Sequence, residues 1–361
     1  MPRCEIPDLA AASRDVLERC RGLGFALGGI APAQASRWRE EVLAWLRAGK
    51  HGQMDYLERD LDLKFEPAGV FPDTQAFIMV ADLYATRNEA AAETPVGHGR
   101  VARYAQGRDY HVTIKNRLHD LSDALRAAYP GWGFRSFVDT VPVLERELAV
   151  QAGLGWQAKN TMVINPRVGS YLLLGGVATS MPLVVPAEQP VVQDHCGTCT
   201  RCIDACPTGA ITPWSVDGSR CISYLTIEHR DRLDPAVHGA MGEWVYGCDV
   251  CQEVCPHNSA RDGEVGERPA AYEPRNVSLP LLEVLGWDDA ARRERFRNSA
   301  MKRATLAMMK RNAVIAAGNL LRVREVPELR ARLVELSLDV GEAEMVRGAA
   351  GEVLAGLKAP R

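Results

Sequence analysis

The chain has 361 residues, of which 47% are hydrophobic and 25% charged, and its formal net charge is -3 at neutral pH. A single hydrophobic core stops growing at about 250–300 residues, so this length predicts two or three domains. The composition is that of a globular protein, and the small net charge gives no global sign of a nucleic-acid partner.

Targeting and membrane segments are not expected. The N-terminal stretch MPRCEIPDLAAASRDVLERC contains acidic residues and no uninterrupted apolar stretch, which excludes a signal peptide and a transit peptide. The longest apolar runs, such as residues 171–178, are far shorter than the ~20 residues that a membrane helix needs. We therefore expect a cytoplasmic protein without a membrane partner.

Helices are predicted in the first 50 residues. Residues 9–24 end in a glycine that suits a helix C-terminus, and residues 34–49 form a second candidate helix. In that second segment Trp38, Val42 and Trp45 share one face, a spacing typical of core packing.

Strand-like runs follow at residues 76–84 and 134–144, with a helical stretch at 114–129 between them. Residues 160–180 are expected to form two strands joined by the turn NPRVGS, because proline and glycine bracket a polar break. This alternation predicts an α/β or α+β layered domain up to about residue 182. The proline-containing stretch 181–193 is typical of a linker.

The C-terminal part is expected to be helical. Residues 259–276 are polar, charged and rich in proline, which suggests a domain boundary after Asn258. Beyond it, a basic residue followed by a helix rich in small residues occurs at Arg311 and again 36 residues later, at Arg347. This period suits paired-helix solenoid repeats of the HEAT kind, although two copies can also arise by coincidence.

Eight of the ten cysteines fall between residues 196 and 255. In a reducing compartment, densely spaced cysteines indicate metal ligands rather than disulfides. The first group has the spacing C-x2-C-x2-C-x3-C-P of a bacterial 4Fe-4S run, formed by Cys196, Cys199, Cys202 and Cys206. A zinc site, the alternative, usually uses two separated C-x2-C pairs.

The second group, in the sequence GCDVCQEVCPHN, lacks one cysteine of the same run. In two-cluster ferredoxins the fourth cysteine of each run ligates the other cluster. The first cluster is then expected to be bound by Cys196, Cys199, Cys202 and Cys255. The second cluster is expected to be bound by Cys206, Cys248, Cys251 and, as the nearest candidate for the missing thiolate, Cys221. We interpret Cys4 and Cys20, in the N-terminal helical region, as small hydrophobic residues.

Two clusters carry electrons one at a time and do not by themselves transform a substrate. A ferredoxin needs only about sixty residues, so roughly 190 residues before the cysteines and 100 after them require another function.

Several long motifs resemble the epoxyqueuosine reductases, which reduce the epoxide of a modified tRNA base to complete queuosine. The similar segments are YAQGRDYH, DTVPVLER, GLGWQAKNTMVINPRVGSYLLLG, CISYLTIEHR, GCDVCQEVCPHN and KRNAVIAAGNL. They extend over nearly the whole chain.

The resemblance implies a multidomain α+β protein with two kinds of cofactor, cobalamin and two 4Fe-4S clusters. We expect a nitroreductase-like α/β cobalamin-binding domain at residues 1–185 and a two-cluster ferredoxin-like module at 186–262. An all-α domain of HEAT-like repeats that binds tRNA is expected at 263–361.

Cobalamin itself is not visible in the residues. The D-x-H-x-x-G signature of corrinoid proteins with a histidine ligand is absent, because Ile114 stands where the glycine should follow Asp109 and His111. We therefore interpret Asp109 and His111 as structural, and the resemblance suggests base-off cobalamin without a protein histidine. The residues expected near the corrinoid are Arg59, Asp139, Asn160, Thr161, Val163, Ser223 and Asp249.

Opening an epoxide to an alkene takes two electrons and two protons, so the leaving oxygen needs an acid. The resemblance assigns this role to Asp139, and we expect its burial among Phe137, Val138 and Val141 to raise its pKa. From the residues alone, a solvated or capping aspartate is the alternative.

The segment from residue 292 to residue 332 contains twelve Lys and Arg residues against three acidic residues, a net charge of +9. Such an imbalance in an acidic chain predicts contact with a phosphate backbone, although a solvated helix face is the alternative. The candidates for tRNA contact are Arg292, Arg293, Lys302, Arg303, Lys310 and Arg311.

Two other functions share some of these features. A corrinoid reductive dehalogenase would combine cobalamin with two clusters, and a non-catalytic iron-sulfur protein would only transfer electrons. The expected partners are a tRNA that carries epoxyqueuosine and an external one-electron donor of the flavodoxin or ferredoxin type. We expect a monomer.

Overall fold

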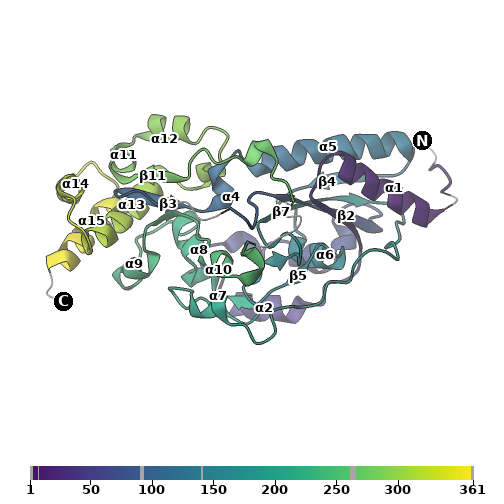
Figure 1. Ribbon diagram of the computed structural model, residues 1–361, viewed down its shortest axis with the longest axis horizontal. Coiled ribbons are helices and arrows are strands. Elements are labelled where there is room, and N and C mark those ends of the chain that lie inside the picture. The colour runs from purple at the N-terminus through teal and green to yellow at the C-terminus, as the bar shows by residue number, and fades with distance from the viewer. Residues whose placement is uncertain (1–2, 7, 90–92, 140, 261–265, 359–361) are drawn as a thin grey trace.

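The computed structural model describes residues 3–6, 8–89, 93–139, 141–260 and 266–358. The molecule is elongated, with the N-terminal sheet at one end and the C-terminal helices at the other (Figure 1). The cysteine-rich segment lies between the two ends, beneath the chain that connects them (Figure 1).

The central sheet of the N-terminal part has four antiparallel strands in the order β1-β2-β7-β4. These strands are β1 (Leu27–Pro32), β2 (Ala76–Leu83), β7 (Leu172–Thr179) and β4 (Phe134–Phe137). Every residue of β2 is buried, because both faces of the sheet are covered. Ile78 and Val80 pack into the core on one face, whereas Phe77 and Met79 pack into the core on the other.

Helices cover both faces of this sheet. On one face lie α1 (Leu9–Gly22) and the long α5 (Tyr110–Ala128), and on the other lies α6 (Glu145–Gln151). Asp109 caps α5 by accepting a hydrogen bond from the backbone N–H of His111 at 3.2 Å. The cap therefore fixes the start of α5, where Asp109 and His111 lie, and both residues belong to the candidate site.

One of the strand predictions was wrong in detail. The strand expected at residues 134–144 ends at Phe137, because Asp139 has a left-handed backbone conformation with φ 59° that cannot continue a strand. The two strands expected at residues 160–180 exist, but the first one, β6 (Val163–Ile164), pairs with β5 (Trp156–Gln157) and not with β7.

The tryptophan face predicted to lie in the core is only half-buried. It belongs to α2 (Arg39–Arg47), which begins just after Trp38. The indole N–H of Trp45 donates to the carbonyl of Val216 at 2.7 Å, so this helix lies against the cysteine-rich segment.

The cysteine-rich segment consists of short elements joined by tight turns. Its helices are α7 (Arg201–Asp204), α8 (Ile222–Ile227), α9 (Pro235–Met241) and α10 (Val250–Glu253), and its hairpin is β8 (Ile211–Thr212) with β9 (Ser215–Val216).

A second sheet joins the three parts of the chain. It takes β3 (His98–Val101) from the N-terminal part, β10 (Trp244–Tyr246) from the cysteine-rich part and β11 (Ser278–Pro280) from the C-terminal part, in the order β10-β3-β11. The short helices α3 (Leu61–Phe65) and α4 (Arg103–Gln106) belong to the N-terminal part. Because the strands are hydrogen-bonded to one another, the three expected domains form one connected structure.

The C-terminal part is helical, as predicted. Its helices are α11 (Leu281–Gly286), α12 (Asp289–Arg295), α13 (Leu306–Leu321), α14 (Pro327–Leu338) and α15 (Glu344–Lys358). The two helices of the 36-residue repeat, α13 and α15, pack closely, since a Cβ on Gly318 would lie 2.4 Å from Val353. The HEAT class of the repeat stays a prediction. Within the described residues, no helix is long and apolar enough to cross a membrane.

Candidate active site and cluster-binding segment

Cysteines of the two sets expected from the sequence lie near one another, and their division between two clusters stays a prediction. Burial raises the pKa of the Cys202 thiol, and the nearby Cys196, Cys255 and Cys199 raise it further. Burial likewise raises the pKa of Cys251, with further increases from Cys248 and Cys221. Thiolates that repel one another in this way lie close together and favour binding of a cationic centre.

Cys206, the remaining member of the expected second set, lies near Cys221. The pKa of the Cys221 thiol is raised by burial and by the charge of Cys206. Cys251 and Cys202 also influence each other, so the two sets adjoin. Their proximity suits the transfer of single electrons between two centres.

The ligand geometry differs from that of a mononuclear metal site. Within the described residues, no three His, Cys, Asp or Glu side chains converge on one point as the ligands of a single ion do. In a 4Fe-4S cluster each thiolate binds a different iron, so the sulfur atoms stand farther apart.

One loop of the N-terminal part supports both cysteine runs. The Lys159 ammonium group donates to the carbonyls of Gly197 at 2.6 Å and Cys199 at 3.0 Å. The neighbouring Asn160 amide donates to the carbonyl of Cys251 at 3.2 Å. This loop was expected to line a corrinoid, and the structure shows that its side chains position the cysteines.

Asp139 lies in a loop between β4 and α6 and is held by three neighbours. Its backbone N–H donates to Glu145 Oε1 at 2.7 Å, which helps to fix the left-handed conformation. Its Oδ2 atom accepts from the Tyr110 hydroxyl at 3.0 Å and lies 3.0 Å from His111 Nε2. The side chain is 56% exposed and so is open to a substrate.

The expected ionisation of Asp139 was wrong. The hydrogen bond from His111 outweighs burial and holds the pKa of Asp139 below its ordinary value. Burial opposes the charged form of His111, but hydrogen bonds to Asp109 and Asp139 raise the pKa of His111 to about 9. At neutral pH the pair is therefore an imidazolium beside a carboxylate, and the transferable proton is on His111.

The pair belongs to a longer chain of hydrogen bonds. His111 Nδ1 lies 2.8 Å from Asp109 Oδ1, and Asp109 Oδ2 accepts from the Lys302 ammonium group at 2.5 Å. Both ring nitrogens of His111 are thus engaged, which agrees with the interpretation that it does not ligate a metal. The sequence alone did not show that His111 contacts Asp139, and its only signal was the adjacency of Asp109, Tyr110 and His111.

Glu145, Arg146 and Thr161 lie around Asp139, and we call this region the Asp139 recess. Loss of solvation lowers the pKa of the Arg146 guanidinium group. Arg146 Nη1 donates to the Thr161 carbonyl at 2.9 Å and to its hydroxyl at 3.1 Å. Burial and the nearby Asp139 charge raise the pKa of Glu145 to about 7.

The residues expected near the corrinoid divide into two groups. Asn160, Val163 and Asp249 are at most 5% exposed, and their contact with a corrinoid stays a prediction. Arg59 is exposed, and Thr161 and Ser223 are half-buried.

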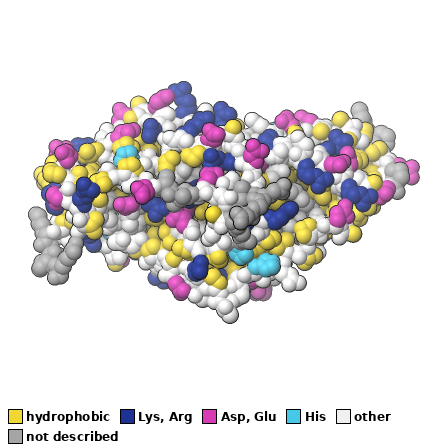
Figure 2. Space-filling view, viewed as in Figure 1, with side chains coloured by type: hydrophobic (Ala, Val, Ile, Leu, Met, Phe, Trp, Pro, Cys, Tyr) yellow, Lys and Arg dark blue, Asp and Glu magenta, His cyan; other side chains and the backbone are white. Residues whose placement is uncertain are grey.

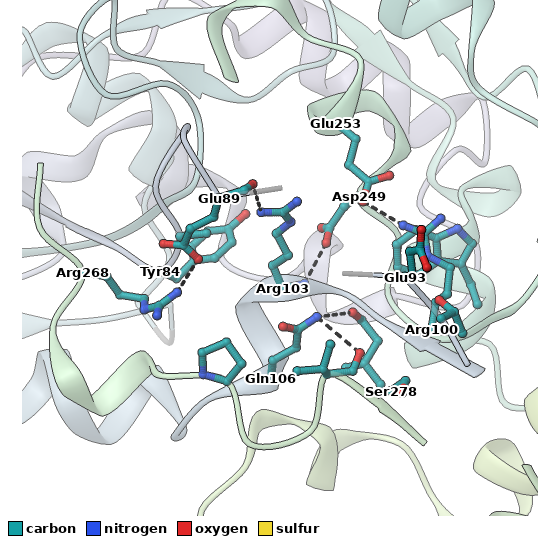
Figure 3. Close-up of a pocket in the computed structure, with 16 residues that line it drawn as sticks. Tyr84, Glu89, Glu93, Arg100, Arg103, Gln106, Asp249, Glu253, Arg268 and Ser278 are labelled. Atoms are coloured by element: carbon teal, nitrogen blue, oxygen red, sulfur yellow. Dashed lines mark hydrogen bonds and ion pairs between the residues drawn. The ribbon is translucent and has the colours of Figure 1, made fainter. Parts of the chain in front are cut away.

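Asp249 lines a separate polar cavity of about 110 Å³, shown in Figure 3. Its carboxylate accepts from the backbone N–H of Arg103 at 2.7 Å. The charged groups around it are paired, as in the contact between Arg100 and Glu253 at 2.7 Å (Figure 3). The pairing indicates a structural junction between the cysteine-rich part and β3.

The basic candidates for RNA contact differ in how exposed their side chains are. Arg293 is exposed on α12, whereas Arg292 donates to the Lys302 carbonyl at 2.7 Å and is half-buried. Lys302 and Arg303 are exposed near the Asp139 recess.

Lys310 and Arg311 were wrongly expected to contact RNA. Lys310 is buried and paired with Glu342 at 2.8 Å. Arg311 is 0% exposed, and its guanidinium group donates to the carbonyls of Leu225, His229 and Asp231. Both side chains therefore join α13 to its neighbours and are not available to phosphate.

Family profiles match two parts of the chain. Residues 195–258 match the "4Fe-4S double cluster binding domain", and residues 64–140 match "Epoxyqueuosine reductase QueG, DUF1730". The first match covers all eight clustered cysteines, and the second includes Asp109, His111 and Asp139.

Curated relatives match most of the chain. An epoxyqueuosine reductase of Pseudomonas aeruginosa is 38% identical over 320 residues, which cover 87% of this chain and 87% of the relative. That of Escherichia coli K12 is 38% identical over 300 residues, covering 82% of this chain and 78% of the relative.

Solved structures agree with the sequence relatives. The structure of an epoxyqueuosine reductase with an epoxyqueuosine-modified tRNA stem loop has a TM-score of 0.86 and 26% identity, and the match covers 98% of this chain and 92% of the other. A Bacillus subtilis epoxyqueuosine reductase, described with its catalytic loop swung out of the active site, has a TM-score of 0.85 and the same identity and coverage. The chain therefore belongs to the epoxyqueuosine reductase family.

Proposed function

We propose that this protein reduces the epoxide of epoxyqueuosine in tRNA to the alkene of queuosine. The observation that carries the proposal is the exposed Asp139 carboxylate, held by His111 in a recess of a protein that also contains a double-cluster segment. Family membership favours this reaction over reductive dehalogenation and over electron transfer alone.

The reaction needs electrons that arrive singly and are used in pairs. We assign one cluster to Cys196, Cys199, Cys202 and Cys255, and the other to Cys206, Cys221, Cys248 and Cys251. The adjoining sets provide a path for single electrons from an external donor of the flavodoxin or ferredoxin type. Cobalamin, when bound, supplies a low-valent cobalt that reacts with the epoxide and accepts single electrons.

The recess suits a large cofactor that needs no histidine from the protein. His111 is engaged at both ring nitrogens, so it does not compete for the cobalt. Thr161 and Ser223 are half-buried and carry hydroxyl groups, and Arg59 is exposed, so these three residues would hold the corrinoid.

Asp139 and His111 supply the proton in this proposal. Among the described residues, the contacts from Tyr110 and His111 both end on Asp139 Oδ2, which leaves Oδ1 to face the leaving oxygen. His111, which is charged at neutral pH, protonates Asp139, and Asp139 donates this first proton to the leaving oxygen as negative charge develops there. The second proton, which releases the oxygen as water, comes from solvent. Asp109 and Lys302 then keep the ring oriented during the transfer.

The tRNA binds, in this proposal, across α12 and the rim of the recess. Figure 2 shows Lys and Arg side chains gathered along the upper edge of the molecule, over α12. Arg293 and Arg295 are exposed there, and Lys302 and Arg303 lie nearer to Asp139. A positive surface that leads into the recess would guide a phosphate backbone toward it. We expect one protein chain to act as a monomer.

The test is anaerobic purification with cobalamin, followed by quantification of iron, sulfide and corrinoid and by a reduction assay. Epoxyqueuosine-containing tRNA should be converted to queuosine-containing tRNA, as measured by mass spectrometry of the digested nucleosides. Absence of conversion by a protein with both clusters and bound corrinoid would overturn the proposal. Turnover of halogenated phenols instead would favour the dehalogenase alternative.

A further inference from the structure

An exposed aromatic side chain lies near Asp139. Tyr56, in the turn Asp55–Glu58, is 42% exposed. Within the described residues, Tyr56 and Trp214 are the two aromatic members of the exposed large hydrophobic residues. Trp214 faces the ammonium group of Lys159, at the first cysteine run. The exposure of the Tyr56 ring therefore needs a separate explanation.

The ring of Tyr56 is held between segments that are distant in sequence. The Arg303 guanidinium group lies 5.6 Å from the ring centroid. Arg303 itself is fixed by two hydrogen bonds to the Glu228 carboxylate, each of 2.9 Å. The N-terminal part, the cysteine-rich part and the C-terminal helices thus each contribute one of these three residues. A planar cation beside an aromatic ring forms a rigid flat surface.

Electrostatics place this surface beside the proposed proton donor. Burial raises the pKa of the Tyr56 hydroxyl, and the charges of Glu228 and Asp139 raise it further. The charge of Arg303 also contributes to the lowered pKa of Asp139. Tyr56, Arg303 and Asp139 therefore lie close enough together for their charges to interact.

We propose that Tyr56, flanked by Arg303, stacks against an unpaired base of the RNA loop next to the nucleotide that enters the recess. The inference rests on the proposed function. A base turned out of its stack leaves its neighbour without a stacking partner, and an aromatic side chain replaces that partner. Every base has a flat π-face, so this contact holds the loop without reading its sequence.

Tyr56 is a positioning residue in this proposal, and its contact is with the loop and not with the epoxide. Substitution should therefore weaken RNA binding and raise KM for tRNA more than it lowers kcat. Stacking of one base on an aromatic residue corresponds to roughly a tenfold or larger change in Kd.

The experiment measures binding of an anticodon stem loop with 2-aminopurine next to the modified nucleotide, whose fluorescence is quenched by stacking. The protein contains both clusters and corrinoid and is compared as wild type, Tyr56→Leu and Tyr56→Phe. Leu338→Ala, an exposed residue at the end of α14, is the surface control. We expect quenching with wild type and Tyr56→Phe, and weaker quenching with about a tenfold higher Kd for Tyr56→Leu.

The outcomes separate this inference from the proposed function. If wild-type protein binds neither the modified nor the unmodified stem loop, the proposed function fails and this inference fails with it. If wild type binds but Tyr56→Leu retains the wild-type Kd and quenching, only the stacking role is overturned. Loss of corrinoid by Tyr56→Leu with unchanged RNA affinity would also overturn it, because the ring would then contact the cofactor.

Discussion

His111 Nε2 lies 3.0 Å from Asp139 Oδ2, and this contact determines which of the two residues carries the proton. The interaction lowers the pKa of Asp139 and helps to raise that of His111 to about 9. In the proposed function, the His111 imidazolium therefore returns a proton to the Asp139 carboxylate that faces the substrate.

The pair predicts how turnover depends on pH. His111 remains charged below its pKa of about 9, so kcat should be flat near neutral pH and fall as pH rises through that value. Its folded pKa is raised above the ordinary 6.5, so the stability that it contributes is complete below about 6.5 and lost as pH rises through about 9. Stopped-flow turnover and thermal unfolding across this range check both effects. His111→Gln should remove the alkaline limb, and an unchanged profile would exclude His111 as the proton store.

Asp139→Asn should abolish most turnover while leaving both clusters and the corrinoid intact. An amide has no proton of suitable acidity to donate, and the loss of general acid catalysis costs about 10²–10⁴-fold. Single-turnover kinetics, with iron, sulfide and corrinoid measured on the same sample, give the comparison. Asp123→Asn, an exposed aspartate paired with Arg126 on α5, is the matched control. Wild-type turnover by Asp139→Asn would contradict the assignment.

Cys221→Ala should remove the second cluster and leave the first. Cys221 is the proposed ligand from outside the two cysteine runs, and its thiol lies close to Cys206. Iron content should fall by about half, and electron paramagnetic resonance of the reduced protein should lose the coupling between the two clusters. Cys20→Ala, at a buried cysteine in α1, should keep both clusters. Two intact clusters in Cys221→Ala would mean that another group completes the set.

Arg311→Met should destabilise the protein without changing the salt dependence of RNA binding. The buried guanidinium group donates to Leu225, His229 and Asp231, and unpaired buried carbonyls cost about 1–3 kcal/mol each. We expect a loss of roughly 3 kcal/mol or more, seen as a lower Tm. An exposed arginine, Arg330→Ala, should have little effect. Unchanged stability together with weaker RNA binding would mean that Arg311 contacts RNA after all.

Arg293→Ala combined with Arg295→Ala should weaken tRNA binding and reduce its salt dependence. Each lost phosphate contact lowers the slope of log K against log salt concentration by about one. Fluorescence anisotropy at several salt concentrations measures this slope. Arg21→Ala, exposed at the end of α1, tests whether any lost positive charge has the same effect. Equal effects of both substitutions would exclude a specific surface on α12.

The sequence by itself determined the features that depend on local spacing. Cysteines two and three positions apart indicated the cluster-binding run, because one short loop can present several thiolates to one cluster. The pattern of apolar residues predicted the positions of β2 and α5 closely. It could do so because β2 is buried on both faces and α5 buries one continuous face.

Only the tertiary structure decided the features that depend on distant neighbours. The ionisation of Asp139 follows from His111, which belongs to another element, so local burial predicted the wrong direction of its pKa. The charge count around Arg311 could not show that its guanidinium group is enclosed by carbonyls of the cysteine-rich part. Composition gives the number of charges, and local patterns predict helices and strands. The burial of a side chain and its pairing with other groups depend on segments that are distant in sequence.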